Sequence, residues 1–223
     1  MNMGREFQLD EEREGRIGLS EAVYCAGKSP AQIGAILDYA VARGTPRLLT
    51  RLSEASLASL PTHHIATLDY DPVSRTAYAG RPRRRSGPAR ITIVAAGTSD
   101  VPVAREAMRT LHFEGYEAVE IVDVGVAGLW RLMRRLDELR GMSVVIVCAG
   151  MDAALPSVIG GLVPGLVIAV PTSIGYGVAA GGRAGLDAAL ASCSPGIVVV
   201  NIDNGYGAAC AAIRALRIRA DRA

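Results

Sequence analysis

The chain has 223 residues, which is enough for one large domain or for one domain with a smaller appendage. Hydrophobic residues make up 50% of it but aromatic residues only 4%, so a core must be built from Ala, Val, Ile and Leu, as in a parallel sheet buried between helices. The net charge of +2 at pH 7 is small, and we therefore expect no nucleic acid and no membrane among the main partners. The charged first residues, and apolar runs that stay below the roughly 20 residues of a membrane span, predict a cytoplasmic protein without a secretory signal.

Residues 1–80 are predicted to form a mainly helical segment. Ser29 and Pro30 are typical of a helix start, and the apolar residues after them recur at helical spacing. A second short helix is expected at about 50–60, followed by a polar turn and one short strand-like run. Residues 81–90 are rich in Arg, Pro and Gly, and we interpret them as a solvated linker rather than as an anion-binding arm.

Residues 91–223 show a regular alternation of apolar and amphipathic segments. Five β-branched apolar runs are predicted to be strands, at 91–97, 118–125, 143–150, 166–171 and 196–203. Near-continuously apolar strands that alternate with helices pair in parallel and are covered on both faces. We therefore predict a flavodoxin-like three-layer αβα sandwich with the strand order 2-1-3-4-5, in which ligands bind at the carboxyl ends of the strands.

The cysteines and histidines restrict the chemistry that this sheet can support. The four cysteines have no CxxC spacing and no histidine nearby, so they are predicted to be reduced thiols rather than zinc ligands or disulfides. Cys148 lies inside an apolar strand and is expected to be a core residue, whereas Cys193 is either an inert surface residue or a nucleophile. We interpret His63 and His64 as part of a surface loop rather than as a metal pair. Because no histidine is predicted at a strand end, acid–base chemistry would depend on carboxylates or on a thiol.

The first predicted strand ends in a turn that suits an anionic ligand. Gly97 permits close backbone approach, and Thr98, Ser99 and Asp100 precede a helix whose free N–H groups can bind phosphate or carboxylate. The alternative is that Ser99 and Asp100 only cap this helix. The turn matches neither the GxGxxG fingerprint nor a Walker motif.

The other strand ends also carry small and acidic residues. Asp123 follows the second strand, and Gly150 and Asp152 follow the third, where Asp152 is either a helix cap or a ligand-facing carboxylate. The loop after the fourth strand is too rich in small residues for a core element and is predicted to cover a ligand. Its candidate contact residues are Ser173, Gly175 and Tyr176.

Several of these strings resemble the LarB family, in the order in which they occur. They are LDEEREGRIGLSEAVYCAGKSPAQI near the N-terminus and, after the linker, AAGTSDVPVAREA, DVGVAGL, VVIVCAGMDAALPSVIGGLV, VIAVPTSIGYG and SCSPGIVVVNIDNGYGAA. The C-terminal domain of that family is related to PurE, the purine-pathway carboxylase and mutase. Gly97 to Asp100 match the glycine-to-Ser-Asp turn of PurE, but Ala154 stands where PurE has a histidine. The resemblance therefore favours LarB over the purine reaction.

The resemblance implies a carboxylase-hydrolase that acts on nicotinic acid adenine dinucleotide. The enzyme would add CO2 to C5 of the pyridinium ring and cleave the phosphoanhydride, releasing AMP and pyridinium-3,5-biscarboxylic acid mononucleotide. That product is the first intermediate toward the nickel-pincer nucleotide of lactate racemase. The resemblance also implies a homo-octamer, Mg²⁺ in the anhydride cleavage, CO2 as co-substrate and no tightly bound organic cofactor. The alternatives are a PurE-like aminoimidazole ribonucleotide carboxylase or mutase, and a nucleotide-binding subunit without catalysis.

The resemblance further implies roles for two candidate catalytic residues. Cys193 matches the nucleophile of the family, whose thiolate would add at C4 of the ring and make C5 nucleophilic. Asp152 matches the acidic residue that would remove the C5 proton, at a position where many relatives carry Glu.

Other residues are candidates for binding the dinucleotide. Asp100, with Thr98 and Ser99, would contact phosphate or ribose, and Asp100 is also a candidate Mg²⁺ ligand. In the N-terminal segment, Lys28 and Arg16 match positions of the family and would reach the dinucleotide; for Arg16 the alternative is a solvated helix charge. The strand-end residues Asp123 and Gly150 and the loop residues named above complete the predicted binding site.

Overall fold

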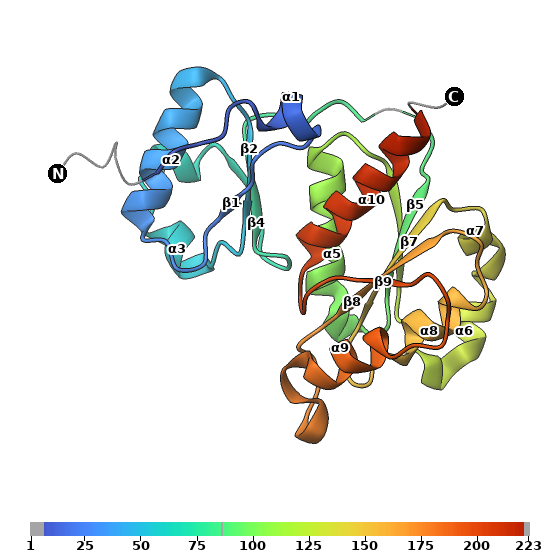
Figure 1. The fold of residues 1–223 in the computed structure, drawn as a ribbon. Coiled ribbons are helices and arrows are strands. Elements are labelled where there is room, and N and C mark those ends of the chain that lie inside the picture. Colours follow the sequence, from blue (N-terminus) through green and yellow to red (C-terminus); the bar gives the residue numbers. More distant parts are fainter. Residues whose placement is uncertain (1–6, 86, 221–223) are drawn as a thin grey trace. The chain divides into compact units, whose positions relative to one another are not determined.

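The computed structural model describes residues 7–85 and 87–220. The chain divides into two compact units, one formed by Met1–Arg84 with Phe113–Gly115 and the other by Arg85–His112 with Tyr116–Ala223 (Figure 1). Among the described residues, no helix has both the length and the apolar character that crossing a membrane would require.

The N-terminal unit contains a four-stranded sheet with the order β1-β2-β4-β3. β1 and β2 are parallel, whereas β4 pairs antiparallel with both β2 and β3. The strands are β1 (Val23–Tyr24), β2 (Arg47–Thr50), β3 (Leu68–Asp71) and β4 (Thr76–Ala79). The helices are α1 (Arg13–Ile17), α2 (Pro30–Arg43), α3 (Glu54–Ala58) and α4 (Thr62–Ile65).

The local sequence explains where α2 begins and ends. The Ser29 side chain accepts the backbone N–H of Gln32, and the Gln32 side chain accepts the backbone N–H of Ser29, which completes a capping box. Pro30 occupies the first turn, and Gly44 ends the helix in the left-handed region, at a φ of 63°. Ile33 lies on the apolar face of α2 and belongs to the buried core of this unit.

The sequence predicts α2, α3 and one short strand-like run, but it predicts neither α4, which it places in a surface loop, nor the four-stranded sheet. Its strands have only two to four residues each, which is too short for an alternating pattern to show. β2 is buried along its whole length although Arg47 and Thr50 are polar. The Arg47 guanidinium lies 3.4 Å from the Glu11 carboxylate, a partner far away in the sequence. Contacts between residues far apart in the sequence influence where strands form, and they cannot be recognised from the residues of the strand itself.

The C-terminal unit is a sandwich around a parallel five-stranded sheet with the order β6-β5-β7-β8-β9. The strands are β5 (Ile91–Ala95), β6 (Ala118–Val122), β7 (Val144–Ala149), β8 (Leu166–Pro171) and β9 (Val198–Val199). They correspond to the five predicted runs, so the flavodoxin-like order 2-1-3-4-5 is confirmed.

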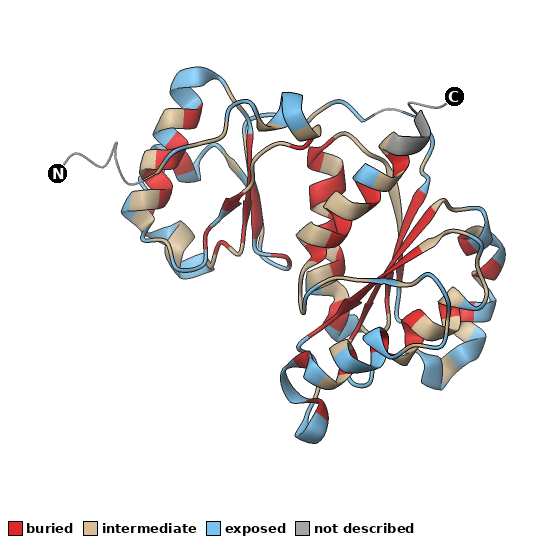
Figure 2. Ribbon diagram, viewed as in Figure 1, coloured by how far each residue is buried: buried red, intermediate tan, exposed pale blue. Residues whose placement is uncertain are grey.

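Helices cover both faces of this sheet (Figure 1). One face carries α5 (Val101–Phe113) and α10 (Gly205–Ala220), and the other carries α6 (Leu129–Met133), α7 (Leu136–Arg140), α8 (Ala154–Gly160) and α9 (Arg183–Leu190). Every residue of β5 and β7 is buried, and Figure 2 shows these central strands between the two helical layers. Burial on both faces explains why these strands are apolar runs without alternation.

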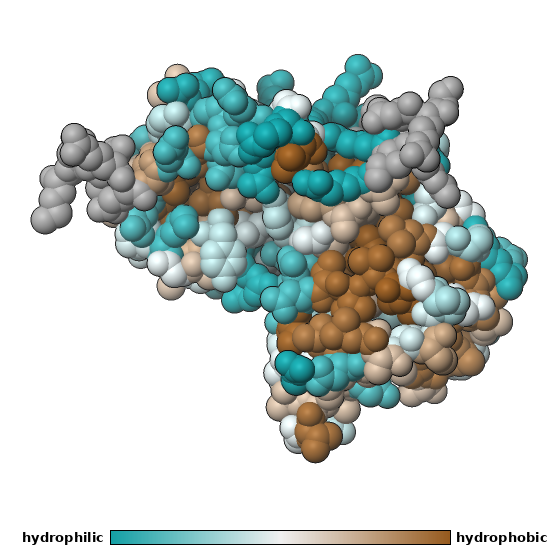
Figure 3. Space-filling model, viewed as in Figure 1, coloured by the Kyte–Doolittle hydropathy of each residue, from teal (hydrophilic) through white to brown (hydrophobic). Residues whose placement is uncertain are grey.

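β9 is much shorter than the predicted strand at 196–203. It lies at one edge of the sheet, and only Val198 and Val199 pair with β8. Val198 is 43% exposed, and Figure 3 shows hydrophobic side chains gathered on the side of the unit that carries β9 and α10. An apolar surface of this kind is typical of proteins that self-associate.

Candidate active site

A cavity of about 400 Å³ lies at the carboxyl ends of β5, β6, β7 and β8. This is the edge of a parallel sheet at which ligands bind, and it includes the point where the strand order reverses between β5 and β7. The cavity is lined by Ala96, Gly97, Ser99, Asp100, Gly125, Val126, Ala127, Arg131, Ala149, Gly150, Met151, Asp152, Ala154, Leu155 and Ile174.

The turn after β5 forms a short 3-10 helix, η2 (Thr98–Asp100), that leads into α5. Gly97 and Ser99 line the cavity, whereas Thr98 is exposed and lies outside its lining. Asp100 is buried, and its two carboxylate oxygens accept hydrogen bonds from the Gly97 N–H at 2.9 Å and the Thr172 hydroxyl at 2.6 Å. Asp100 therefore fastens the turn after β5 to the end of β8.

Burial raises the pKa of the Asp100 carboxyl, and the hydrogen bonds from Thr172 and Gly97 oppose that rise. Each Asp100 oxygen accepts one of these two hydrogen bonds, and a carboxylate keeps further lone pairs with which it could contact a metal ion. Among the residues that the structure describes, no three Asp, Glu, His or Cys side chains converge at these strand ends. Mg²⁺ is usually held by one or two carboxylates together with substrate phosphates, so Asp100 stays a candidate contact only for an ion that arrives with the substrate.

The turn after β7 comes close to the turn after β8. A Cβ atom on Gly150 would lie 2.3 Å from the Ile174 carbonyl oxygen and 2.8 Å from the Thr172 hydroxyl oxygen. The Met151 N–H donates to the same Ile174 carbonyl at 2.8 Å. A glycine is therefore needed at position 150 because the two turns approach closely there. Gly150 also lines the cavity.

Replacing Gly150 with alanine should destabilise the protein by about 1–3 kcal/mol, because the two turns must separate to admit a methyl group. Urea denaturation followed by circular dichroism would measure the change. Gly161→Ala is the matched control, since its nearest neighbour beyond the adjoining residues is a carbonyl oxygen at 3.6 Å. Equal stabilities of the two variants would contradict this account of Gly150.

Asp152 lies in a strained part of the same turn. It lines the cavity, and the residues on either side of it, Met151 and Ala153, have φ angles of 56° and 48°. These left-handed conformations are unfavourable for residues with a side chain, and strained backbone of this kind recurs at active sites as well as in turns. The Asp152 carboxylate also accepts the backbone N–H of Ala154, at 3.3 Å. Asp152 therefore has a long hydrogen bond to the start of α8 and also lines the cavity. The first observation supports a helix cap, and the second supports a carboxylate that faces a ligand.

The sequence does not single out Arg131 of α6, which also lines the cavity. Its guanidinium forms an ion pair with Asp123, a predicted binding residue that is exposed and lies outside the lining. Arg131 is the cationic group that lines this cavity, and it can bind a phosphate or carboxylate in place of Asp123. One feature of the sequence could have identified Arg131 as a site residue. It lies three residues after Gly128, in the first turn of a helix that follows a strand.

The loop after β8 contributes less to the cavity than the sequence predicts. Ile174 lines it, whereas the neighbouring Ser173, Gly175 and Tyr176 do not. The Ser173 N–H donates to the Asp203 carboxylate at 2.8 Å, and Tyr176 is 77% exposed. The loop continues into a 3-10 segment, η4 (Gly177–Gly182).

Cys193 is exposed and does not line the cavity. Its segment is attached to α8: the Ser192 hydroxyl lies 2.7 Å from the Ser157 hydroxyl, and the Ser194 hydroxyl donates to the Ser157 carbonyl at 2.5 Å. Ser157 follows the cavity residue Ala154 by about one helical turn, or ~5 Å along the helix axis. The Cys193 segment therefore lies near the cavity without entering it.

Burial separates the cysteines by chemical reactivity. It raises the pKa of the Cys25 thiol to about 12 and that of the Cys148 thiol well above its usual value. Neither thiol can form a thiolate readily near neutral pH, and both lie out of reach of a ligand. Cys148 is a core residue, as the sequence predicts, and Cys193 is the exposed thiol of the four.

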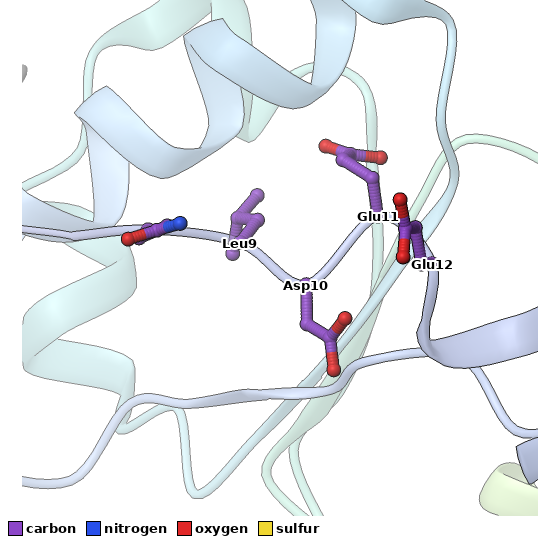
Figure 4. A pocket seen from close by; sticks show the side chains of 5 residues that line it. Leu9, Asp10, Glu11 and Glu12 are labelled. Carbon is purple, nitrogen blue, oxygen red and sulfur yellow. The ribbon is translucent and has the colours of Figure 1, made fainter. Parts of the chain in front are cut away.

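The predicted binding residues Arg16 and Lys28 belong to the N-terminal unit. Arg16 is ion-paired with Asp10, and the hydrogen bond from Arg16 lowers the pKa of that carboxyl. Asp10 also lines a hollow of about 490 Å³ together with Gln8, Leu9, Glu11 and Glu12 (Figure 4). In Figure 4 the Asp10 and Glu11 side chains leave the chain on opposite sides. This acidic lining does not suit an anionic dinucleotide, so the cavity of the C-terminal unit remains the candidate site.

Comparison with known proteins places both parts of the chain in one family. Residues 90–223 match the family model of AIR carboxylase, which agrees with the parallel sheet and its strand-end cavity. Residues 2–81 match the model of the LarB/PurE-like N-terminal domain. An uncharacterized protein of Methanocaldococcus jannaschii is 38% identical over 209 residues, which cover 91% of this chain and 80% of that protein. The chain therefore belongs to the LarB family and has a PurE-like C-terminal domain, which confirms the resemblance.

Proposed function

We propose that this protein is a carboxylase-hydrolase that converts nicotinic acid adenine dinucleotide, CO2 and water to pyridinium-3,5-biscarboxylic acid mononucleotide and AMP. Membership in a carboxylase family supports carboxylation in general. The observation that carries the specific proposal is Asp152, held in a strained turn at the cavity where a base is needed. Ala154 occupies the place of the PurE histidine, which disfavours the purine reaction.

The proposed carboxylation uses a thiol and a base. The Cys193 thiolate adds to C4 of the electron-poor pyridinium ring, which gives a neutral dihydropyridine with an enamine at C5 and C6. C5 then attacks CO2, and the ring nitrogen becomes an iminium. Asp152 accepts the C5 proton and so restores the enamine, which expels the thiolate and regenerates the pyridinium ring. The ring itself is the electron sink, so the proposal needs no organic cofactor.

The same cavity offers groups that suit the rest of the substrate. Arg131 provides a guanidinium for a carboxylate or phosphate, and the backbone around Gly97 and Ser99 precedes α5, where anions are stabilised. In this proposal Asp100 is a positioning residue, because it fixes that turn through Gly97 and Thr172. Water then cleaves the phosphoanhydride to release AMP.

Self-association is part of the proposal. The hydrophobic surface on the side of β9 and α10 supports contacts between copies of the chain (Figure 3), and the resemblance implies an octamer. Light scattering coupled to size exclusion would measure the assembly, and a monomer at micromolar concentration would contradict this part.

The reaction can be tested directly with ¹³C-labelled bicarbonate. Incubation of the purified protein with the dinucleotide and Mg²⁺ should yield AMP and a nucleotide that carries one labelled carboxylate, detected by mass spectrometry. A folded protein that binds the dinucleotide but forms neither product would contradict the proposal and indicate a binding subunit. Turnover of aminoimidazole ribonucleotide in a parallel reaction would indicate the purine activity instead.

A further inference from the structure

Two neighbouring histidines and an aspartate from distant parts of the sequence converge in the N-terminal unit. Asp38 lies on α2, and His63 and His64 lie on α4. The Asp38 Oδ1 atom is 3.0 Å from His64 Nε2 and 3.6 Å from His63 Nε2, and the three ligand atoms all lie within 4.8 Å of one another. The sequence predicts a surface loop at these histidines; this is wrong, because α4 is a helix and His64 is only 3% exposed.

One of these groups is a buried polar atom without a hydrogen bond. His64 Nε2 is shielded from solvent and has no hydrogen-bond partner, although Asp38 Oδ1 is close to it. A buried imidazole nitrogen in this state has an energetic cost, which a bound cation would remove. Asp38 and His63, by contrast, each have side chains 68% exposed, so an ion could reach the cluster from solvent.

The packing of α4 on α2 explains how the cluster is held. Pro61, which precedes α4, lies against Gly34 of α2, and a Cβ atom on Gly34 would be 3.8 Å from the Pro61 ring. Asp38 follows Gly34 by about one turn on the same face of α2. The backbone N–H of His64 donates to the Pro61 carbonyl at 2.9 Å, which fixes the start of α4 above this face. The ligand atoms are therefore positioned by a packed helix pair.

We propose that Asp38, His63 and His64 form a binding site for a divalent transition metal, of which Zn²⁺ fits best. Two imidazole nitrogens and one carboxylate oxygen are a donor set that Zn²⁺ uses, whereas Mg²⁺ and Ca²⁺ prefer oxygen ligands throughout. Bonds of about 2.0–2.1 Å in a tetrahedron place neighbouring ligands ~3.3 Å apart, close to the observed 3.0 and 3.6 Å. The fourth position is open to water, and the ion connects α2 to α4.

Metal analysis of the full chain tests this site. Protein stripped with a chelator, incubated with Zn²⁺ and dialysed should retain one zinc per chain by mass spectrometry of the metal, and should not retain Mg²⁺. Asp38→Asn and His63→Gln should each bind Zn²⁺ at least ~10-fold more weakly. Both positions are exposed, so these variants should fold normally. His112→Gln removes the remaining histidine of the chain, on α5, and should leave zinc binding unchanged.

A thermal measurement provides a second readout. Zn²⁺ that binds the folded chain should raise the Tm of the wild type and of His112→Gln but not that of Asp38→Asn or His63→Gln. Absence of zinc from the wild type would overturn the proposal. Equal zinc binding by all four proteins would also overturn it, because the ion would then lie elsewhere, for example at an exposed thiol.

Discussion

Cys193→Ser should lower kcat/KM for carboxylation by roughly 10³-fold or more, because the proposed reaction begins with addition of a thiolate to the ring. A serine hydroxyl is far less acidic and would leave C5 without nucleophilic character. Labelled bicarbonate gives the rate, and the unfolding midpoint shows whether the fold is kept. We expect little change in stability, since Cys193 is exposed and lies in a segment held by its neighbours Ser192 and Ser194.

Cys210→Ala is the matched control for this substitution. Cys210 is a partly buried thiol on α10, away from the strand-end cavity, and its replacement should leave turnover within a few-fold of the wild type. A Cys193→Ser enzyme with near-normal turnover would exclude the thiol mechanism. Loss of activity in both variants would indicate a structural effect, which a lowered unfolding midpoint would reveal.

Thiol alkylation tests the same residue without a substitution. Iodoacetamide should modify Cys193 well before Cys25 and Cys148, because burial protects those two thiols and raises their pKa values. The dinucleotide should slow this reaction if its pyridinium ring lies against Cys193. Modification at an unchanged rate in the presence of saturating dinucleotide would contradict the proposed position of the ring.

The fold of the C-terminal unit could be predicted because its signals are local. Each central strand is buried on both faces and is therefore an apolar run in the sequence, and each run is followed by a helix. The edge strand β9 shows the limit of this signal, since only two residues of the predicted apolar run pair with β8. The sheet of the N-terminal unit leaves no such signal, because polar residues such as Arg47 are buried there through contacts distant in the sequence.

The candidate site could be predicted only as far as the topology determines it. The carboxyl ends of parallel strands meet at one edge, so Gly97, Gly150 and Asp152 were expected to converge, and all three line the cavity. The topology does not determine whether a loop residue such as Tyr176 lines the cavity, because that depends on the conformation of the loop. The cluster of Asp38, His63 and His64 could not be predicted either. His64 is buried and lies beside Asp38 of α2, a helix that begins more than thirty residues earlier in the sequence.

Asp152→Asn should lower the carboxylation rate by about 10²–10⁴-fold, the range expected when a general base is removed. The asparagine side chain has nearly the same shape, and its amide oxygen can still accept the Ala154 N–H. The fold and the strained turn should therefore persist, while the ability to accept the C5 proton is lost. Asp152→Glu should retain most of the activity, because it keeps a carboxylate that can accept the C5 proton.

The contrast between these two variants separates a base from a helix cap. A cap needs only an oxygen near the N–H of Ala154, so a residue that only caps α8 would be replaced by Asn with little loss of activity. A base needs a carboxylate, so its replacement by Asn must affect proton removal. An inactive Asp152→Glu enzyme beside an active Asp152→Asn enzyme would show that the residue is structural.

A substrate with deuterium at C5 distinguishes the two roles by a further measurement. If Asp152 removes the C5 proton, Asp152→Asn should make that step limiting, and deuterium should then slow turnover more in the variant than in the wild type. The ring should also remain attached to the thiol for longer, so the intact protein should show a covalent adduct at Cys193 by mass spectrometry. Substitution of a cap would change neither the isotope effect nor the adduct, because both depend on which group accepts the proton.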